Sequence, residues 1–288
     1  MRFLSGSAAR HRLLESLDLV HHAVEYLNAE VQSTETIAMA PTPAGGDWIR
    51  CGDLISNASL LASTVRRSGQ ELGIQRDDVA ASLFILGWSY RVMAMSVACL
   101  AKAGLIPDSS ASHMAVGLSG PWPSLVAYVD PPAQVICDYD GPLDRVLRGQ
   151  LLDEALEFMT QTAIAGHLQP LVGMLHQTFR VGTRMLWGNV AASSAAVFME
   201  ARTALGEWIE ALGDRFFEIA PAELSGLGSF LVLEHAGERG WFWERKNCCL
   251  WYKVPGAWQN VCNNCCRTPR AERHDSYRAA LQAQANGR

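Results

Sequence analysis

The sequence is poor in charge, and the charge that it has is not concentrated anywhere. Only 18% of its 288 residues are Asp, Glu, Lys or Arg, the formal net charge is -5, and no run of five like charges occurs. Proteins bind nucleic-acid backbones through clustered positive charge, which this composition does not supply. A nucleic-acid partner is therefore not expected.

The chain also lacks a long apolar stretch that is free of charge. Its first 22 residues have no continuous apolar centre like that of a signal peptide, and they predict a helix instead. Residues 79–101 are the most apolar stretch, but Arg91 interrupts them, and an arginine at a bilayer centre costs roughly 2.5 to 3.5 kcal/mol. Asp77 and Asp78 before this stretch and Gly104 after it are typical of the ends of a soluble core helix. We expect no transmembrane span and a cytoplasmic location, with peripheral membrane association left open.

Motifs for nicotinamide or flavin cofactors are missing as well. "GLGSFL" (226–231) has two glycines at the spacing of a dinucleotide-binding loop, but it lacks the third glycine and the strand-helix context. "GLSG" (117–120) is one residue short of a nucleophile elbow. A redox function would therefore require a separate electron donor.

What the chain does have is hydrophobic residues at helical spacing, and they make up 49% of it. Apolar stripes predict helices over residues 13–31, 54–65 and 78–103. Helical spacing returns from residue 143 to 219, with predicted breaks at Gly166, at residues 180–183 and at Gly206. The stripe of the first helix is Leu13, Leu17, Val20, Val24, Leu27 and Val31. The predicted fold class is mainly α.

Prolines punctuate residues 105–142 and change this pattern. "SLVAYV" (124–129) and "AQVICDY" (133–139) are rich in β-branched and aromatic residues and flank "DPP". They predict a hairpin-like pair of short strands, as a small β insert near residues 124–139. We expect a helical body over residues 1–225 and a separate C-terminal segment over residues 226–288, which ends in a polar tail or short helix.

Most of the potential metal ligands are scattered and predict ordinary packing. Cys51, Cys99 and Cys137 occur singly and are expected to be small buried hydrophobic residues. The histidines at positions 21, 22, 167 and 176 form no pattern of metal ligands or acid-base pairs, so we expect core or surface roles for them.

Five of the eight cysteines, by contrast, fall within residues 247–266. Cys248 and Cys249 are adjacent, twelve residues separate them from Cys262, and Cys265 and Cys266 follow after two more. Disulfides are disfavoured in a reducing cytoplasm. Two pairs of thiolates can enclose a zinc ion or a [2Fe-2S] cluster, and the adjacent pair fits the longer cluster slightly better than a single ion. Residue chemistry alone leaves both alternatives open.

A resemblance bears on this choice. "CCLWYKVPGAWQNVCNNCC" (248–266) resembles the C-terminal segment of the FhuF-type siderophore-iron (ferric iron) reductase family, in which an adjacent Cys pair and a later Cys-x-x-Cys bind one [2Fe-2S] cluster. "VAASLFILGWSYRVM", "HLQPLVGMLHQTFRV" and "LWGNVAASSAA" are similar to the helical body of that family. The resemblance implies Cys248, Cys249, Cys262 and Cys265 as the cluster ligands.

This chain departs from the family pattern in one feature, the length of the spacer, and the difference affects which cysteine is the fourth ligand. The spacer of the family has ten residues, whereas this chain has twelve between Cys249 and Cys262. A loop absorbs two residues at little entropic cost. The adjustment leaves Cys266 as an alternative to Cys265.

The resemblance implies a ferric-siderophore reductase that transfers one electron to Fe(III) held by a siderophore, of the hydroxamate type for example. Hard oxygen donors hold Fe(III) far better than Fe(II), so reduction releases the metal. The electron donor would be a separate protein, such as a ferredoxin or a flavin reductase. Two alternatives stay open: a zinc-stapled helical binding module, and a module that binds a siderophore without reducing it, because the helical body resembles part of the siderophore synthetases.

Several side chains near the cysteines have two interpretations each. Arg245, Lys246 and Lys253 would raise the potential of a cluster and attract an anionic partner, or form a solvated basic rim. The nearby aromatic residues would shield a cluster from water or simply pack, and packing is the commoner role. They are Trp241, Trp243, Trp251, Tyr252 and Trp258.

Overall fold

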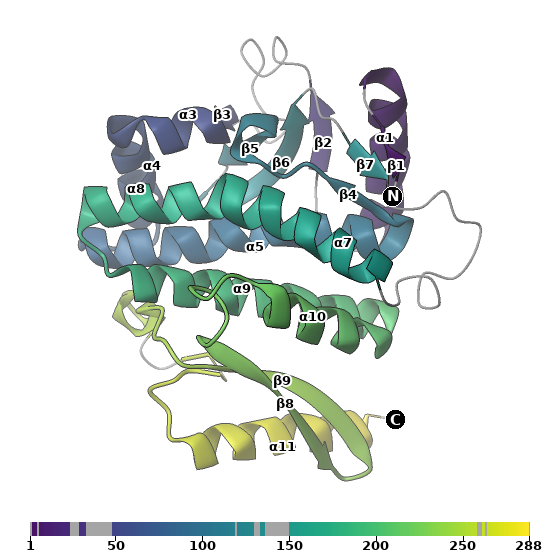
Figure 1. Ribbon diagram of the computed structural model, residues 1–288. Helices are drawn as coiled ribbons and strands as arrows, with labels where there is room; N and C mark the ends of the chain where they lie inside the picture. Colours follow the sequence, from purple (N-terminus) through teal and green to yellow (C-terminus); the bar gives the residue numbers. More distant parts are fainter. Residues whose placement is uncertain are drawn as a thin grey trace.

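The computed structural model describes residues 2–4, 6–23, 29–32, 48–118, 120–129, 133–135, 150–257, 261–262 and 264–287. Helices dominate, as predicted, and small β-sheets accompany them. Figure 1 shows long helices stacked in the body, with a β-hairpin and the C-terminal helix packed below them. Cys137 and Trp258 lie outside the described residues, as does the chain between residues 136 and 149.

Helix α5 (Asp77–Ala103) lies at the centre of the core. It packs against α9 (Thr183–Leu205) and α4 (Ala58–Glu71), and Gly104 ends it in the left-handed conformation at φ 61°. It is long and apolar enough to cross a membrane, but 78% of its most apolar 18-residue stretch is buried inside the protein. Its apolar surface is therefore explained by core packing, as the sequence predicts.

The N-terminal end of α5 differs from the prediction. Arg76, not an aspartate, is the N-cap residue, and Asp77 and Asp78 lie in the first turn. Their carboxylates form ion pairs instead, Asp77 with Arg66 and Asp78 with Arg76, each at 2.7 Å. Acidic side chains still favour this end because the helix dipole is positive there.

The predicted helices 13–31 and 54–65 are each interrupted. Helix α1 spans Gly6–Ala23 and buries Leu13 and Leu17, but Val31 lies on strand β2 (Ala29–Gln32). The second helix is two, α3 (Cys51–Ser56) and α4, because the Asn57 side chain accepts hydrogen bonds from the backbone N–H groups of residues 59 and 60. Such a side-chain cap starts a new helix.

The predicted hairpin over residues 124–139 is wrong in its pairing. Strand β6 (Pro123–Val129) pairs antiparallel with β5 (Met114–Leu118) and parallel with β2, and β3 (Trp48–Arg50) forms the other edge of that sheet. Strand β7 (Ala133–Val135) belongs to a second sheet, between β1 (Arg2–Phe3) and β4 (Leu105–Pro107). Composition predicts strands, but distant chain segments decide their partners.

The second half of the body follows its predicted breaks with one exception. The breaks after α8 (Gln169–Phe179) and between α9 and α10 (Trp208–Ile219) are confirmed, with Arg180 at φ 58° and Gly206 at φ 104°. Gly166 does not break the helix. It lies in a π-helical segment, η2 (Thr160–Leu168), that joins α7 (Gln150–Met159) to α8 without interruption.

After residue 226 the chain forms a hairpin that the sequence analysis did not predict. Strands β8 (Gly228–His235) and β9 (Glu238–Arg245) pair antiparallel, and a 3-10 turn, η3 (Trp251–Lys253), follows. The polar tail is a full helix, α11 (Arg270–Asn286), which buries Tyr277 and Leu281 against the hairpin. The boundary between residues 225 and 226 stays a prediction.

Candidate functional site

The clustered cysteines lie in two short segments that meet beside the body. Cys248 and Cys249 follow β9 after two residues, and a backbone hydrogen bond of 2.9 Å from Cys265 N to Cys262 O closes a turn in the second segment. The thiol of Cys262 donates a hydrogen bond to the sulfur of Cys249, which joins the two segments. Cys249 and Cys265 are buried, and Cys248, Cys262 and Cys266 are half-buried.

The local backbone favours negative charge on these sulfurs. Leu250 adopts φ 67°, and its N–H approaches the Cys248 sulfur at 3.4 Å. The hydrogen bond from Cys262, then the Arg245 charge and the Trp251 N–H, lower the pKa of Cys249. The pKa of Cys262 is raised, since that thiol holds the shared proton. Cys249 is therefore polarised toward the thiolate, the form in which cysteine binds metals.

Arg245 belongs to a buried polar network that fixes the first cysteine segment to the body. Its guanidinium donates to Asn247 O at 2.6 Å and to the side-chain oxygen of Asn189 at 2.8 Å. Asn189, on α9, donates in turn to the Ser82 backbone oxygen on α5 at 2.6 Å, and the Ser82 hydroxyl donates to Cys249 O at 2.9 Å. The sequence analysis missed Asn189 and Ser82, because no motif marks them.

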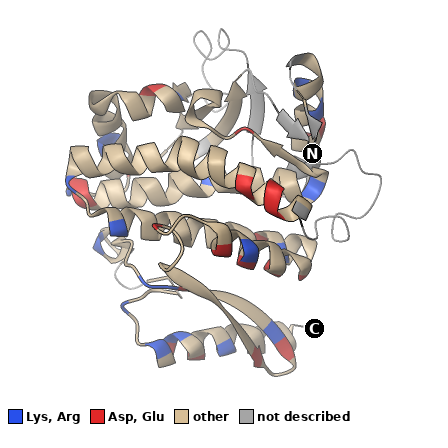
Figure 2. Cartoon of the chain, viewed as in Figure 1, with Lys and Arg blue, Asp and Glu red and all other residues tan. Residues whose placement is uncertain are grey.

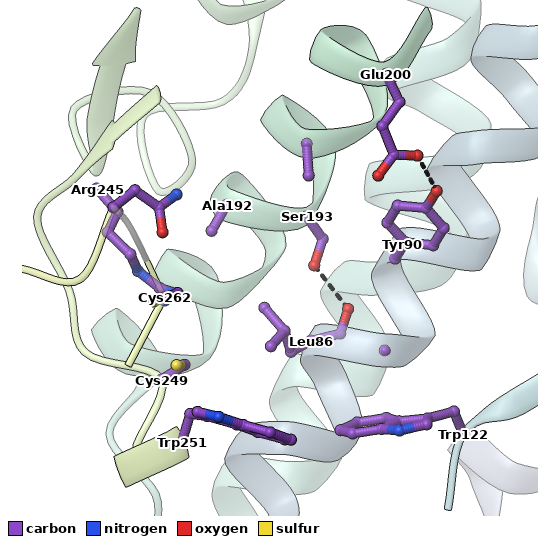
Figure 3. Close-up of a pocket in the computed structure, with 13 residues that line it drawn as sticks. Leu86, Tyr90, Trp122, Ala192, Ser193, Glu200, Arg245, Cys249, Trp251 and Cys262 are labelled. Carbon is purple, nitrogen blue, oxygen red and sulfur yellow. Dashed lines mark hydrogen bonds between the residues drawn. The ribbon is translucent and has the colours of Figure 1, made fainter. Parts of the chain in front are cut away.

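A pocket of about 460 Å³ lies between α5, α9 and the cysteine segments (Figure 3). Cys249 and Cys262 line one part of it, beside Arg245, and Tyr90 with Glu200 line another (Figure 3). Apart from these five residues, small, aromatic and other uncharged side chains line it: Leu86, Gly87, Trp122, Ala192, Ser193, Ala196, Trp251 and Asn264. The sequence analysis predicted none of the body residues of this pocket.

Two tryptophans from distant parts of the chain form one wall of the pocket. The ring centroids of Trp122 and Trp251 are 6.4 Å apart with 30° between the ring planes, and Figure 3 shows Trp251 beside Cys249 and Trp122 on the side of Trp251 away from Cys249. Tyr90 donates a short hydrogen bond to Glu200, which fixes two polar side chains at the wall formed by α5 and α9. The pocket therefore combines apolar walls with few polar groups, as small-molecule sites usually do.

The other residues that the sequence analysis considered have core roles or, for His176, an exposed position with a hydrogen bond to Val181 O at 2.8 Å. His167 is fully buried, and it binds Ser109 O through Nδ1 at 2.9 Å and the Trp88 indole N–H through Nε2 at 3.0 Å. Cys51 and Cys99 are buried, which raises the pKa of both thiols, that of Cys99 to about 12. Trp241 and Trp243 are buried and contact Phe230, so packing explains them. The side chains of His21 and His22 lie outside the described residues.

Soft sulfur donors gather here, and their chemistry suits a thiolate-bound iron-sulfur cluster. Backbone N–H groups point at two sulfurs, and a buried guanidinium lies nearby; both features are known to tune such clusters. Within the part of the chain that the structure describes, no three side chains of Cys, His, Asp or Glu form a group compact enough for one metal ion.

Two family models match the chain and define its class. The model described as "Ferric iron reductase FhuF-like transporter" matches residues 82–221, and the one described as "FhuF 2Fe-2S C-terminal domain" matches residues 245–267. Together they cover more than half of the chain. The protein is a helical iron-sulfur protein with a C-terminal [2Fe-2S] domain. It belongs to the FhuF-like ferric iron reductase family, and the zinc alternative is not supported.

The fold also resembles solved structures of another kind. Aerobactin synthetase IucA from a hypervirulent pathotype of Klebsiella pneumoniae, with bound ATP, has a TM-score of 0.54 and 15% identity to this chain. The match covers 73% of this chain and 43% of the synthetase, so the chain spans less than half of that protein. A second structure of IucA, described without ATP, gives a TM-score of 0.52 at 14% identity, and the match covers 72% of this chain and 43% of that one. No curated protein matches the sequence. At this identity the likeness concerns the fold alone.

Proposed function

We propose that the protein reduces siderophore-bound Fe(III) to Fe(II) in a one-electron step, in the cytoplasm. One observation carries this proposal: Cys249 and Cys262, from the two cysteine segments, line the same pocket as helices α5 and α9 of the body. A chelate in this pocket would lie directly against the sulfur ligands. Short distances favour electron transfer, so the pocket is where a ferric chelate would have to bind.

Cys248, Cys249, Cys262 and Cys265 are the proposed ligands of the cluster, with Cys266 as the alternative to Cys265. The bound [2Fe-2S] cluster supplies a one-electron redox couple. The chain contributes the buried Arg245 charge, the N–H groups beside Cys248 and Cys249, and the burial of Cys249 and Cys265. These features set the potential at which an electron is accepted and passed on.

The pocket walls would bind and orient the chelate. A volume of about 460 Å³ lies within the usual range for small-molecule sites, roughly 300 to 1,000 Å³. Trp122 and Trp251 offer flat apolar faces to the organic backbone of a siderophore, and Trp251 would shield Cys249 from water. A siderophore with hard oxygen donors, such as a hydroxamate, would lose affinity for the iron once it is Fe(II). Release of Fe(II) would then follow from its weak binding to the siderophore.

The test is to purify the protein without oxygen and to measure iron, zinc and acid-labile sulfide in one sample. We expect two irons and two sulfides per chain, visible absorption that dithionite bleaches, and an EPR signal in the reduced state. Protein reduced with dithionite, then freed of it, is mixed with a ferric trihydroxamate, and Fe(II) is trapped with a chromogenic chelator. One Fe(II) should form per reduced chain; binding of the chelate without Fe(II) would favour the non-reducing module.

A variant with a blocked pocket distinguishes loss of chelate binding from loss of the cluster. Ala196 lines the pocket on α9, whereas Ala204 is exposed on the same helix outside it. Ala196→Phe should reduce the rate of Fe(III) reduction at least tenfold and leave the visible spectrum unchanged, because the ring would occupy the space for the chelate. Ala204→Phe is the matched control and should behave like wild type. Equal rates in both variants would place the chelate elsewhere.

A further inference from the structure

The pocket beside the cysteine segments has two polar ends that differ in charge. Cys249, Cys262 and Arg245 line the end at the cysteine segments, and Tyr90 and Glu200 line the other end (Figure 3). Cys249 is 5% exposed, whereas Glu200 is exposed, so the carboxylate lies toward the solvent side of the pocket. A ligand that fills the pocket would therefore contact different polar groups at its two ends.

Helix geometry sets the distance between these ends. Ala192, Ala196 and Glu200 follow one another at intervals of four residues on α9, so they lie along one face of the helix. Eight positions separate Ala192 from Glu200, which is roughly 12 Å along the axis at the usual rise of an α-helix. Gly188, one turn before Ala192, lies under Asn247 of the first cysteine segment. The carboxylate is thus within reach of an extended arm of a ligand whose metal centre lies beside the cysteines.

Tyr90 fixes the position of the carboxylate. Its hydroxyl, on α5, donates a short hydrogen bond to Glu200 on α9. A carboxylate accepts several hydrogen bonds, so the contact with Tyr90 leaves acceptor capacity for a ligand. Arg91, the next residue on α5, donates to Pro123 O at 2.9 Å and does not line the pocket. Among the described lining residues, Arg245 at the opposite end is the only one with a positive charge.

The charge of the pocket limits the chelates that suit it. A [2Fe-2S] cluster held by four thiolates is anionic in both redox states, and Glu200 adds a negative charge at the outer end. Three hydroxamates balance Fe(III) and give a neutral complex, whereas three catecholates give an anionic one, which this pocket would repel. A neutral chelate with an amine on an extended arm matches both ends, because an alkyl amine is cationic at neutral pH.

We propose that Glu200, held by Tyr90, is a specificity-determining residue that binds a cationic amine arm of the chelate. This inference rests on the proposed function, since it assigns the part of the substrate that the pocket recognises. The iron end would lie beside Cys249 and Cys262, and the arm would extend along α9 to Glu200. No bond forms or breaks at the carboxylate, which accepts charge-assisted hydrogen bonds from the ammonium group.

The carboxylate would act on binding, not on electron transfer, because it lies at the end of the pocket away from the sulfurs (Figure 3). Charge-assisted hydrogen bonds are roughly twice as strong as neutral ones. We expect about a tenfold preference for a chelate with a free amine over the same chelate with the amine blocked. Glu200 is exposed, so salt should reduce this preference.

The test measures binding with Ga(III) in place of Fe(III), because Ga(III) has the same charge and binds hydroxamates but is not reduced. The probes are the Ga(III) complexes of desferrioxamine B, a linear trihydroxamate with one terminal amine, and of its N-acetyl and N-succinyl derivatives. The arms of these three complexes are cationic, neutral and anionic. Calorimetry gives the Kd of each for the full chain with its cluster, at low and at high salt.

The variants separate charge from structure. Glu200→Gln removes the charge, and Tyr90→Phe removes the hydroxyl that holds the carboxylate. Glu157→Gln is the matched control, since Glu157 is exposed on α7 and does not line the pocket; Figure 2 shows acidic residues on this helix. Circular dichroism and the visible spectrum check that each variant is folded and holds its cluster.

Wild type and the control should bind the amine complex about tenfold more tightly than the acetylated one at low salt. Glu200→Gln should lower this ratio to about one, and Tyr90→Phe should lower it in part. Glu200→Lys should reverse the order, so that the succinylated complex binds more tightly than the amine complex. Such a reversal would not follow from a general loss of structure.

Four outcomes would overturn the inference. They are the absence of measurable binding, equal affinity of wild type for the amine and acetylated complexes, a preference that Glu200→Gln retains, and an equal loss of affinity for all three complexes in Glu200→Gln. The last would mean that Glu200 only joins α9 to α5. Reduction is measured separately with the Fe(III) complexes: selective Ga(III) binding without Fe(II) formation would contradict the proposed function alone, and Fe(II) formation without selectivity would contradict this inference alone.

Discussion

Arg245 is the residue on which the site depends most, apart from the cysteines. It is 5% exposed, it forms no ion pair among the described residues, and its hydrogen bonds all go to neutral oxygens. A buried charge without a counter-charge is costly unless another group compensates it. The Arg245 charge lowers the pKa of Cys249 and opposes the raised pKa values of Cys262 and Cys266, so Arg245 and a thiolate-bound cluster would stabilise each other.

Arg245→Gln should therefore lower the reduction potential of the cluster, on the order of tens of millivolts. A positive charge favours the reduced state, which carries one more electron, and glutamine removes that charge while it can still bind Asn189. Arg245→Lys keeps the charge and should stay close to the wild-type potential. Potentiometric titration followed by visible absorption makes the measurement. Equal potentials in wild type and the glutamine variant would contradict the role that we assign to Arg245.

The fourth cluster ligand is also decided by single residues. Cys265 is 6% exposed and closes the turn with Cys262, whereas Cys266 is half-buried. Serine at position 248, 249, 262 or 265 should lower iron and sulfide content below half of wild type. Cys266→Ser should retain most of both. Iron and sulfide assays with visible spectra give the answer, and the opposite pattern at positions 265 and 266 would make Cys266 the ligand.

At the scale of elements, α9 positions the site because small residues allow close approach. Gly188 lies under Asn247, and a Cβ at position 188 would be 2.5 Å from the Asn247 Cβ. Further along the helix, Ala192 and Ala196 leave room for the pocket. Helix α9 therefore supports the cysteine segments at one end and lines the pocket with its middle.

Gly188→Ala should destabilise the contact between α9 and the segment before Cys248. The added methyl group overlaps backbone-proximal atoms that have little freedom to move, and such overpacking costs about 1–3 kcal/mol. We expect a lower thermal midpoint by circular dichroism and a faster loss of visible absorption in a chelator. Gly173→Ala on α8 is the control, since no atom lies within 4 Å of its added Cβ.

That control should raise the free energy of unfolding by about 0.5–1 kcal/mol, because alanine favours a helix more than glycine does. Its rate of cluster loss should equal that of wild type. If Gly188→Ala were as stable as Gly173→Ala, the close contact between α9 and Asn247 would not be a constraint on the fold.

At the scale of the whole molecule, His167 ties several parts of the body together. It connects Trp88 on α5, the Ser109 backbone and the π-helical segment η2. Burial lowers its pKa to about 4 from 6.5, although the hydrogen bond to Ser109 opposes this shift. The neutral ring is required, because Nε2 accepts the hydrogen bond from Trp88.

Stability should therefore fall as the pH falls from about 6.5 to 4. In that window the unfolded chain binds a proton at His167 and the folded chain does not, so acid favours unfolding, by at most about 3 kcal/mol. Urea unfolding at pH 7 and pH 5 measures the effect. His167→Gln should be less stable at pH 7 and lose less between the two pH values, while His235→Gln, at the half-buried end of strand β8, should keep the wild-type dependence.

The sequence by itself determined the class of fold, the central helix and the cysteine chemistry. Helical spacing predicts residues 78–103 correctly, since a buried helix needs apolar residues all around it. The spacing of Cys248, Cys249, Cys262 and Cys265 leaves zinc and a cluster open, and the resemblance of residues 248–266 to the FhuF-type family implies the [2Fe-2S] domain that the family model identifies. These features are local: nearby residues along the chain carry all the information.

Tertiary structure alone decided the strand partners, the pocket and the network around Arg245. Val31 lies on a strand because β6 pairs with it, and Trp122 meets Trp251 although 129 positions of sequence separate them. Ser82, Asn189 and Arg245 come from three elements and become a network only when these elements pack. Such sites arise from packing between distant segments, and no periodicity or motif in one sequence encodes which segments meet.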